Sequence, residues 1–163
     1  MTRSITRILV PVDFSEPSDA ALEYATGLAE RLGASLHLLH VFEDPLWTTG
    51  AMAAEMYVPV PEGLREALLA NARTQLAERA NKLDAERFHL TTDVYMGPIA
   101  AGITEFATQK QIDLIVIGTH GRGGMSHLLL GSVAERVVRS APCPVLTVRT
   151  STVATPRPTV AAA

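Results

Sequence analysis

The chain has little of several features that mark particular classes of protein. No apolar run approaches the roughly 20 residues of a membrane-spanning helix, so we expect no membrane partner. The single cysteine, Cys143, excludes an internal disulfide, and its place between two prolines at the start of an apolar segment favours a buried structural thiol. The charged first residues are not followed by a signal-peptide core, so the sequence predicts a cytoplasmic protein.

Positive charge is also scarce. Lys82 and Lys110 are the only lysines, the arginines are scattered, and the formal net charge is -3. Nucleic-acid-binding proteins usually carry a basic stripe, so we expect no nucleic-acid partner. No lysine follows Lys110, which excludes a Walker phosphate-binding loop because that motif ends in Gly-Lys-Ser/Thr. The first apolar segment also lacks the Gly-x-Gly-x-x-Gly fingerprint of dinucleotide-binding folds.

What the chain does contain is an alternation of strand and helix patterns. Its 163 residues are 47% hydrophobic and 19% charged, which is typical of one compact domain. The patterns predict strands over 8–12, 35–42, 90–96, 113–118 and 145–148, and helices from Ser18 or Asp19 to Leu32, over 62–83, from Pro98 to Ala107, and after Gly131. Residues 1–149 are predicted to form the domain, and 150–163, without periodicity and with two prolines, are expected to be disordered.

The alternation of strands and helices determines the predicted fold class. It indicates an α/β protein with an open five-stranded parallel sheet, helices on both faces and right-handed crossovers. The segment 113–118 is almost continuously apolar, as is usual for a strand covered on both faces. In such sheets ligands bind beyond the carboxyl ends of the strands, where the strand order reverses.

A glycine-rich segment from Gly118 to Ser132 joins the fourth predicted strand to the last helix. Gly118 and Gly121 permit positive φ and a close approach of backbone to ligand, and consecutive amides in such a turn can surround an anion. Gly131 and Ser132 would present helix amides and the positive end of the helix dipole to the same anion. Phosphate is the natural occupant. The alternative is a flexible connection whose glycines only relieve strain, with Arg122 either paired with phosphate or solvated.

The spacing Gly118-x-x-Gly121, nine residues, Gly131-Ser132 resembles the Gly-2x-Gly-9x-Gly-Ser/Thr signature of the ATP-binding branch of the universal stress protein family. Further similar segments are Ile-Leu-Val-Pro-Val-Asp-Phe-Ser at the first strand, Leu-Leu-His-Val at the second, Gly97-Pro98 after the third, and Pro-Cys-Pro-Val-Leu-Thr-Val-Arg at the end. The likeness covers about residues 4–149. With it we expect a Rossmann-like fold of the adenine nucleotide alpha hydrolase-like type, with strand order 3-2-1-4-5.

The resemblance implies binding residues at the ends of the first two strands. Pro11, Val12 and Asp13 would lie beside the nucleotide. Asp13 would bond a ribose hydroxyl or help to hold Mg²⁺ near the phosphates, with a turn or helix-capping role as the alternative. Ser15 would contribute a hydroxyl or serve the same turn. Val41 occupies the position where main-chain groups of family members recognise adenine.

The resemblance places the remaining binding residues in the glycine-rich segment. Gly118, Thr119, His120, Gly121 and Arg122 would wrap the ribose and phosphates, and Gly131, Ser132 and Val133 would supply amides and a hydroxyl to the phosphates. His120 could act as acid, base or phosphoacceptor, but no carboxylate of the loop would orient it, and we predict no catalytic residue. His37 and His40 fall on opposite faces of a strand, which argues against a shared metal site.

The function predicted is a regulatory or stress-response module that binds ATP, or AMP or ADP, with Mg²⁺. One alternative is a slow ATPase or phosphotransfer enzyme, although the sequence offers no clear base, lysine clamp or second acidic residue. Another is a protein-interaction module that binds no nucleotide. Val145–Val148 is short, apolar and at a predicted sheet edge, and the resemblance implies a homodimer through it. The apolar stretch 43–61 could be a lid, a partner surface or a packing element.

Overall fold

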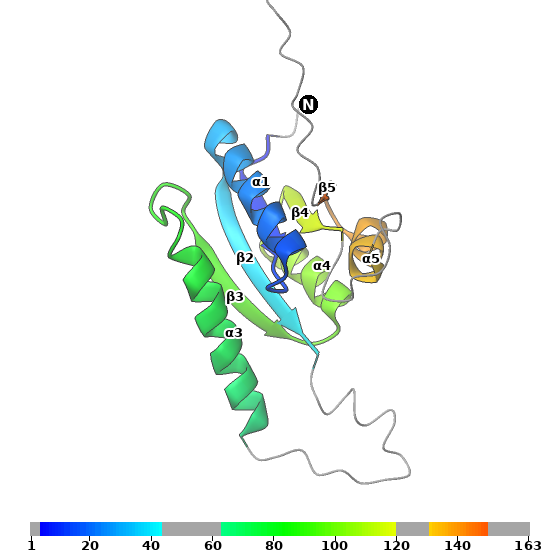
Figure 1. Ribbon diagram of the computed structural model, residues 1–163. Coiled ribbons are helices and arrows are strands. Elements are labelled where there is room, and N and C mark those ends of the chain that lie inside the picture. Colours follow the sequence, from blue (N-terminus) through cyan, green and yellow to red (C-terminus); the bar gives the residue numbers. More distant parts are fainter. Residues whose placement is uncertain (1–3, 44–62, 120–130, 150–163) are drawn as a thin grey trace, which may run out of the picture.

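The computed structural model describes residues 4–43, 63–119 and 131–149, which form a sheet covered by helices on both faces (Figure 1). In chain order the elements are β1 (Arg7–Pro11), α1 (Glu16–Leu32), β2 (Ser35–Phe42), α3 (Leu64–Ala80), β3 (Thr91–Met96), α4 (Ile99–Gln109), β4 (Leu114–Gly118), α5 (Ser132–Ser140) and β5 (Val145–Val148). The five strands are parallel and run in the order β3-β2-β1-β4-β5. The predicted α/β class and strand order are therefore confirmed.

Two apolar cores lie on the two faces of the sheet. Helices α1 and α3 pack on one face, and α4 and α5 pack on the other (Figure 1). Successive residues of β1 point to opposite faces, so Ile8 and Val10 belong to one core and Leu9 to the other. All three are fully buried. This double coverage explains why the central strands read as continuous apolar runs.

Helix α1 begins earlier than the sequence predicted. Ser15 is its N-cap, and the Ser15 side chain accepts a hydrogen bond from the backbone amide of Ser18. Pro17 lies in the first turn, where a missing amide proton costs no helical hydrogen bond. The predicted start at Ser18 or Asp19 was late because Pro17 was taken as part of the loop. The predicted stop at Gly33 is confirmed, with φ of 63° in the left-handed region.

The strand order reverses between β1 and β4. The chain leaves β1 for β2 and β3 on one side, then returns to β4 on the other side of β1. The two strands pair in parallel through Ile8 with Leu114 and Leu9 with Ile115. Their carboxyl ends, followed by the connections to α1 and α5, therefore lie at the switch point where parallel α/β sheets bind ligands.

Two smaller observations bear on the sequence predictions. Cys143 is partly exposed, not buried, although it packs against the core beneath α4 and α5. Of the helices formed by the described residues, none has both the length and the apolar character needed to cross a membrane.

Candidate functional site

The fold brings the ends of β1 and β4 together with the start of α5. Val12 follows β1 and is buried, and its amide donates to the carbonyl oxygen of Leu39 on β2 at 2.8 Å. Thr119 follows β4 and accepts, through its carbonyl oxygen, a hydrogen bond from the amide of Gly131 at 2.6 Å. Because β1 and β4 are neighbouring parallel strands, residues predicted from two distant parts of the sequence lie at the same, carboxyl, end of the sheet.

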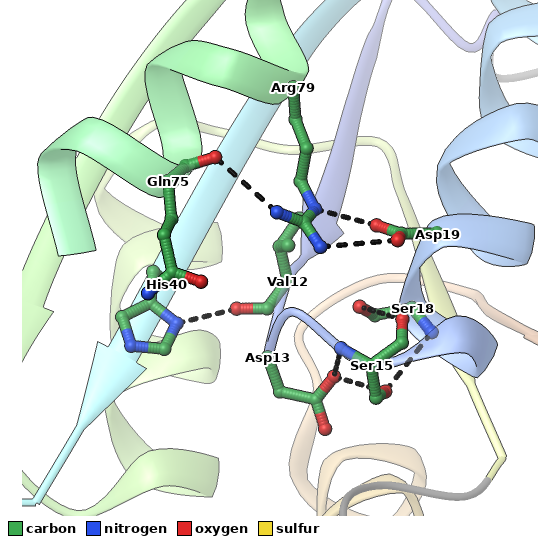
Figure 2. Close-up of polar contacts among 8 residues, drawn as sticks. All are labelled: Val12, Asp13, Ser15, Ser18, Asp19, His40, Gln75 and Arg79. Carbon is green, nitrogen blue, oxygen red and sulfur yellow. Dashed lines mark hydrogen bonds and ion pairs between the residues drawn. The ribbon is translucent and has the colours of Figure 1, made fainter. Parts of the chain in front are cut away.

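Asp13 and Ser15 form a hydrogen-bonded turn between β1 and α1. The Asp13 Oδ1 atom accepts from the Ser15 amide at 3.0 Å and also from the Ser15 hydroxyl. The other carboxylate oxygen of Asp13 points away from this turn (Figure 2). The turn role considered for both residues is therefore confirmed, whereas the helix-capping role considered for Asp13 belongs to Ser15. The ribose and Mg²⁺ roles of Asp13 stay predictions.

Phe14, between these two residues, has an unusual backbone conformation. Its φ of 66° lies in the left-handed region, which for a bulky residue costs about 1–3 kcal/mol. Its ring stacks on the His40 imidazole, with 4.3 Å between centroids, and lies beneath the Arg79 guanidinium, whose Cζ is 4.9 Å from the ring centroid. The sequence prediction missed this cluster. The available signal in the sequence was the bulky Phe14 between two polar residues of the predicted binding turn.

His40 and Arg79 are themselves held by further contacts (Figure 2). His40 Nδ1 lies 2.6 Å from the carbonyl oxygen of Val12 and must carry the proton, because a carbonyl can only accept. Arg79 makes two hydrogen bonds to the Asp19 carboxylate, from Nε at 2.6 Å and from Nη2 at 3.1 Å. Helix α3 is thereby attached to the first turn of α1.

Gly118 is required for close packing and not for a special backbone angle. A Cβ on Gly118 would lie 2.6 Å from the carbonyl oxygen of Pro17, closer than side chains allow. Its φ is not in the left-handed region, so the positive φ that glycine permits is not used at this position. Gly118 instead lets the first turn of α1 approach the end of β4.

Thr119 and Gly131 both use their backbone groups within the fold. Thr119 is buried and donates its amide to the carbonyl oxygen of Val148 on β5 at 2.9 Å. The Gly131 amide, expected to face a phosphate, is bonded to Thr119, and the φ and ψ of Gly131 are −58° and 147°, which other residues also adopt. These two residues therefore form part of the framework of the site.

The first turn of α5 is the remaining source of amides. Ser132 is its first residue, as predicted, and no side chain among the described residues caps it. The first amides of α5, those of Ser132, Val133 and Ala134, lie at the positive end of the helix dipole, and within the described part of the chain no capping side chain accepts from them. Such a terminus favours an anion.

Val41 lies near the end of β2, beside the end of β1. Its side chain is buried in the core next to α4, where a Cβ on Gly102 would come within 3.0 Å of Val41 Cγ1. Its neighbour His40 points to the opposite face, toward Phe14. The main-chain role predicted for Val41 is compatible with a buried side chain and stays a prediction.

Three predicted residues, His120, Gly121 and Arg122, lie outside the described residues, as do most of the stretch 43–61 and the segment 150–163. His37 and His40 are on opposite faces of β2, as predicted: His37 Nδ1 lies 2.6 Å from Thr91 Oγ1, on the side away from Phe14. Over the described ranges, no group of three His, Cys, Asp or Glu residues is placed to hold a metal.

Comparisons with known proteins give a consistent result. The model of the universal stress protein family matches residues 4–149. Universal stress protein YxiE of Bacillus subtilis is 34% identical over 154 residues, which cover 88% of this chain and 98% of that protein. The solved structure of the hypothetical protein MJ0577 of Methanocaldococcus jannaschii has a TM-score of 0.76 at 25% identity and covers 93% of this chain and 100% of that chain.

A further solved structure is described with a ligand. The Arabidopsis thaliana universal stress protein family protein At3g01520, with AMP bound, has a TM-score of 0.60 and covers 90% of this chain and 93% of that chain. At 20% identity it shows a common fold.

Proposed function

Because this chain belongs to the universal stress protein family, we propose that it binds an adenine nucleotide, ATP foremost, at the carboxyl ends of β1, β2 and β4. The observation that carries the proposal is that the Asp13 turn follows β1 while the start of α5 is bonded to Thr119, which follows the neighbouring strand β4, so that both lie at the switch point of the sheet. One of these features offers a carboxylate oxygen and the other offers amides to an anion.

In this proposal each part of the nucleotide has a separate partner. The phosphates lie at the first turn of α5, against the amides of Ser132 and Val133, with Gly121 and Arg122 beside them. The second Asp13 oxygen accepts from a ribose hydroxyl. The main chain at Val41 contacts adenine, which suits a residue whose side chain is committed to the core.

Mg²⁺ would enter this site together with the phosphates. Magnesium usually keeps several waters and is held by one or two carboxylates and the phosphate oxygens of the substrate. The Asp13 carboxylate suits that requirement because it is a negatively charged oxygen ligand directly after the carboxyl end of β1 (Figure 2). The ion would neutralise phosphate charge, a role that a lysine fills in a Walker loop, and no lysine follows Lys110 in this chain.

We propose further that the protein is a regulatory or stress-response module of the cytoplasm and a homodimer. Strand β5 forms one edge of the sheet, where it pairs with β4, and its side chains are partly exposed. An apolar edge strand of this kind is a template for pairing with a second copy. A protein that binds nucleotide without hydrolysing it needs no catalytic group, and we assign none.

Calorimetric titration with ATP, AMP and ADP, with and without Mg²⁺, tests the proposed function. The expected result is one nucleotide per chain, with tighter binding of ATP when Mg²⁺ is present. Analysis of nucleotide released from the purified protein by acid is a second test. Absence of binding at millimolar ATP with Mg²⁺ would reject the proposal.

A further inference from the structure

We propose that Arg79 is a positioning residue for the nucleotide site, acting through the ring of Phe14. Arg79 belongs to α3, which contributes none of the residues predicted to contact the nucleotide. It stabilises the turn that carries Asp13 and Ser15 in the conformation that binds the nucleotide. The inference rests on the proposed function, since it concerns the same site.

The turn needs such support because its central residue is strained. Phe14 lies at φ of 66°, a region that bulky side chains rarely adopt. Asp13 and Ser15 on either side depend on it, because their mutual hydrogen bonds close the turn around Phe14. A backbone in this conformation persists when contacts of the side chain fix it.

Besides packing against the apolar core, the Phe14 ring contacts two polar side chains. The His40 imidazole stacks on it at 4.3 Å between centroids, with 28° between the planes. The Arg79 guanidinium lies over it at 4.9 Å from the centroid, within the range of a cation–π interaction. His40 is fixed by the carbonyl oxygen of Val12, so the residue before Asp13 is held as well.

Arg79 is itself held by Asp19, and these contacts connect Arg79 back to the residues of the Asp13 turn. The guanidinium makes two bonds to the Asp19 carboxylate and a third, from Nη1 at 3.4 Å, to the carbonyl oxygen of Gln75. The Asp19 amide donates to the carbonyl oxygen of Ser15 at 3.0 Å. The path from Phe14 through Arg79 and Asp19 therefore returns to Ser15. With its side chain only 16% exposed, Arg79 is also shielded from solvent more than a typical surface arginine.

The chain offers a control in Arg87, which makes the same kinds of contact with a more exposed side chain. This arginine also donates to a carboxylate, that of Glu30, and also lies over an aromatic ring, that of Phe88, at 5.6 Å from the centroid. Phe88 lies at the amino end of β2, where its carbonyl oxygen accepts from Leu36, far from the Asp13 turn. Arg87→Ala removes the same kinds of contact without touching the site.

The experiment compares the full chain with Arg79→Ala and Arg87→Ala. The dissociation constant of ATP with Mg²⁺ is measured by calorimetry, and amide hydrogen exchange of the peptide containing Asp13 to Ser15 is measured without nucleotide. Arg79→Ala should raise the dissociation constant about tenfold and speed exchange of that peptide, whereas Arg87→Ala should change the constant less than about twofold. Equal affinities of the two variants, with unchanged exchange, would overturn the inference while leaving the proposed function intact.

A second pair of variants tests the contribution of the Phe14 aromatic ring alone. These variants also test the inference if Arg79→Ala fails to fold. Phe14→Tyr and Phe14→Leu both keep a Cβ at the strained position, so the backbone penalty is the same in each. Only Phe14→Tyr keeps an aromatic face for Arg79 and His40. We expect Phe14→Tyr to bind ATP as the unaltered chain does and Phe14→Leu to bind about tenfold more weakly. Equal binding by both would overturn the inference. No binding by the unaltered chain would reject the proposed function and the inference with it.

Discussion

The carbonyl oxygen of Pro17 lies 2.6 Å from the position that a Cβ on Gly118 would occupy, so the start of α1 and the end of β4 touch backbone to backbone. This contact brings the Asp13 turn against the strand that leads into the glycine-rich segment. It also explains why glycine stands at the end of β4 without a left-handed φ.

Gly118→Ala should therefore destabilise the protein. A methyl group cannot enter without moving α1 or β4, and overpacking of this kind costs typically about 1–3 kcal/mol. Gly27→Ala is the control, because a Cβ there meets nothing within 4 Å and the residue lies within α1. That variant should gain about 0.5–1 kcal/mol. Urea unfolding measures both; a neutral Gly118→Ala would show that the contact relaxes freely.

Asp113 gives the protein a defined acid sensitivity. Burial raises the pKa of Asp113, but hydrogen bonds from the amide and hydroxyl of Thr6 and the amide of Arg7, with the Arg7 charge, outweigh it and lower the pKa below 3.8. The lowered pKa means that the ionised carboxylate stabilises the fold. This stabilisation is complete above the unfolded-state pKa of 3.8 and is lost as pH falls through the lower folded value.

Asp113→Asn should thus be less stable than the unaltered chain at pH 7, by about 1 kcal/mol given the partial exposure of the site. The difference in unfolding free energy between the two proteins should shrink as the pH falls below 3.8. Thr6→Val, which loses only the hydroxyl donor, should show a smaller difference. Urea unfolding across the pH range measures this. A difference that stays constant down to pH 2 would contradict the role given to Asp113.

Gly131→Ala should weaken nucleotide binding and leave the fold intact. Its φ of −58° and ψ of 147° are open to alanine, so the backbone need not move. A methyl group next to the first amides of α5 would crowd a bound phosphate, and we expect about a tenfold higher dissociation constant for ATP. Gly27→Ala again serves as the control. Unchanged affinity of Gly131→Ala, with normal thermal unfolding, would count against a phosphate at this helix start.

The oligomeric state tests the role proposed for β5. Light scattering with size-exclusion chromatography should give the mass of two chains. Val145→Lys adds a charge to the edge strand, a device that blocks pairing in natural sheets, and should shift the mass toward one chain. Val138→Lys on α5, at a residue that is 47% exposed, provides the control. A single-chain mass for the unaltered protein at high concentration would contradict the proposed dimer.

The fold could be predicted from the sequence because its signals are local and repeated. The runs around Leu9 and Ile115 are apolar over several residues, and Gly33 ends a helix as glycine usually does. Strand order followed from the resemblance of segments, not from periodicity. The turn at Asp13 was predicted with two possible roles, and the structure shows the hydrogen bonds of the turn itself.

Other features of the site could not be predicted, because they depend on where the folded backbone lies. A glycine such as Gly118 is equally compatible with positive φ or with close packing, and only the position of Pro17 distinguishes them. The hydrogen bond from the Gly131 amide to the carbonyl oxygen of Thr119 joins residues that are separated in the sequence, so no local sequence pattern predicts it. The contact of Arg79 with Phe14 joins residues that are distant in the sequence and belong to different elements.

The most direct test of an adenine-nucleotide site is the affinity for ATP with Mg²⁺ in the unaltered chain and in Asp13→Asn. Asparagine keeps an oxygen that can accept from Ser15, so the turn is preserved, but it removes the negative charge available to Mg²⁺. We predict binding of one ATP per unaltered chain, and a loss of about tenfold in Asp13→Asn that is confined to solutions containing Mg²⁺. Failure of the unaltered chain to bind ATP at millimolar concentration would contradict the central claim.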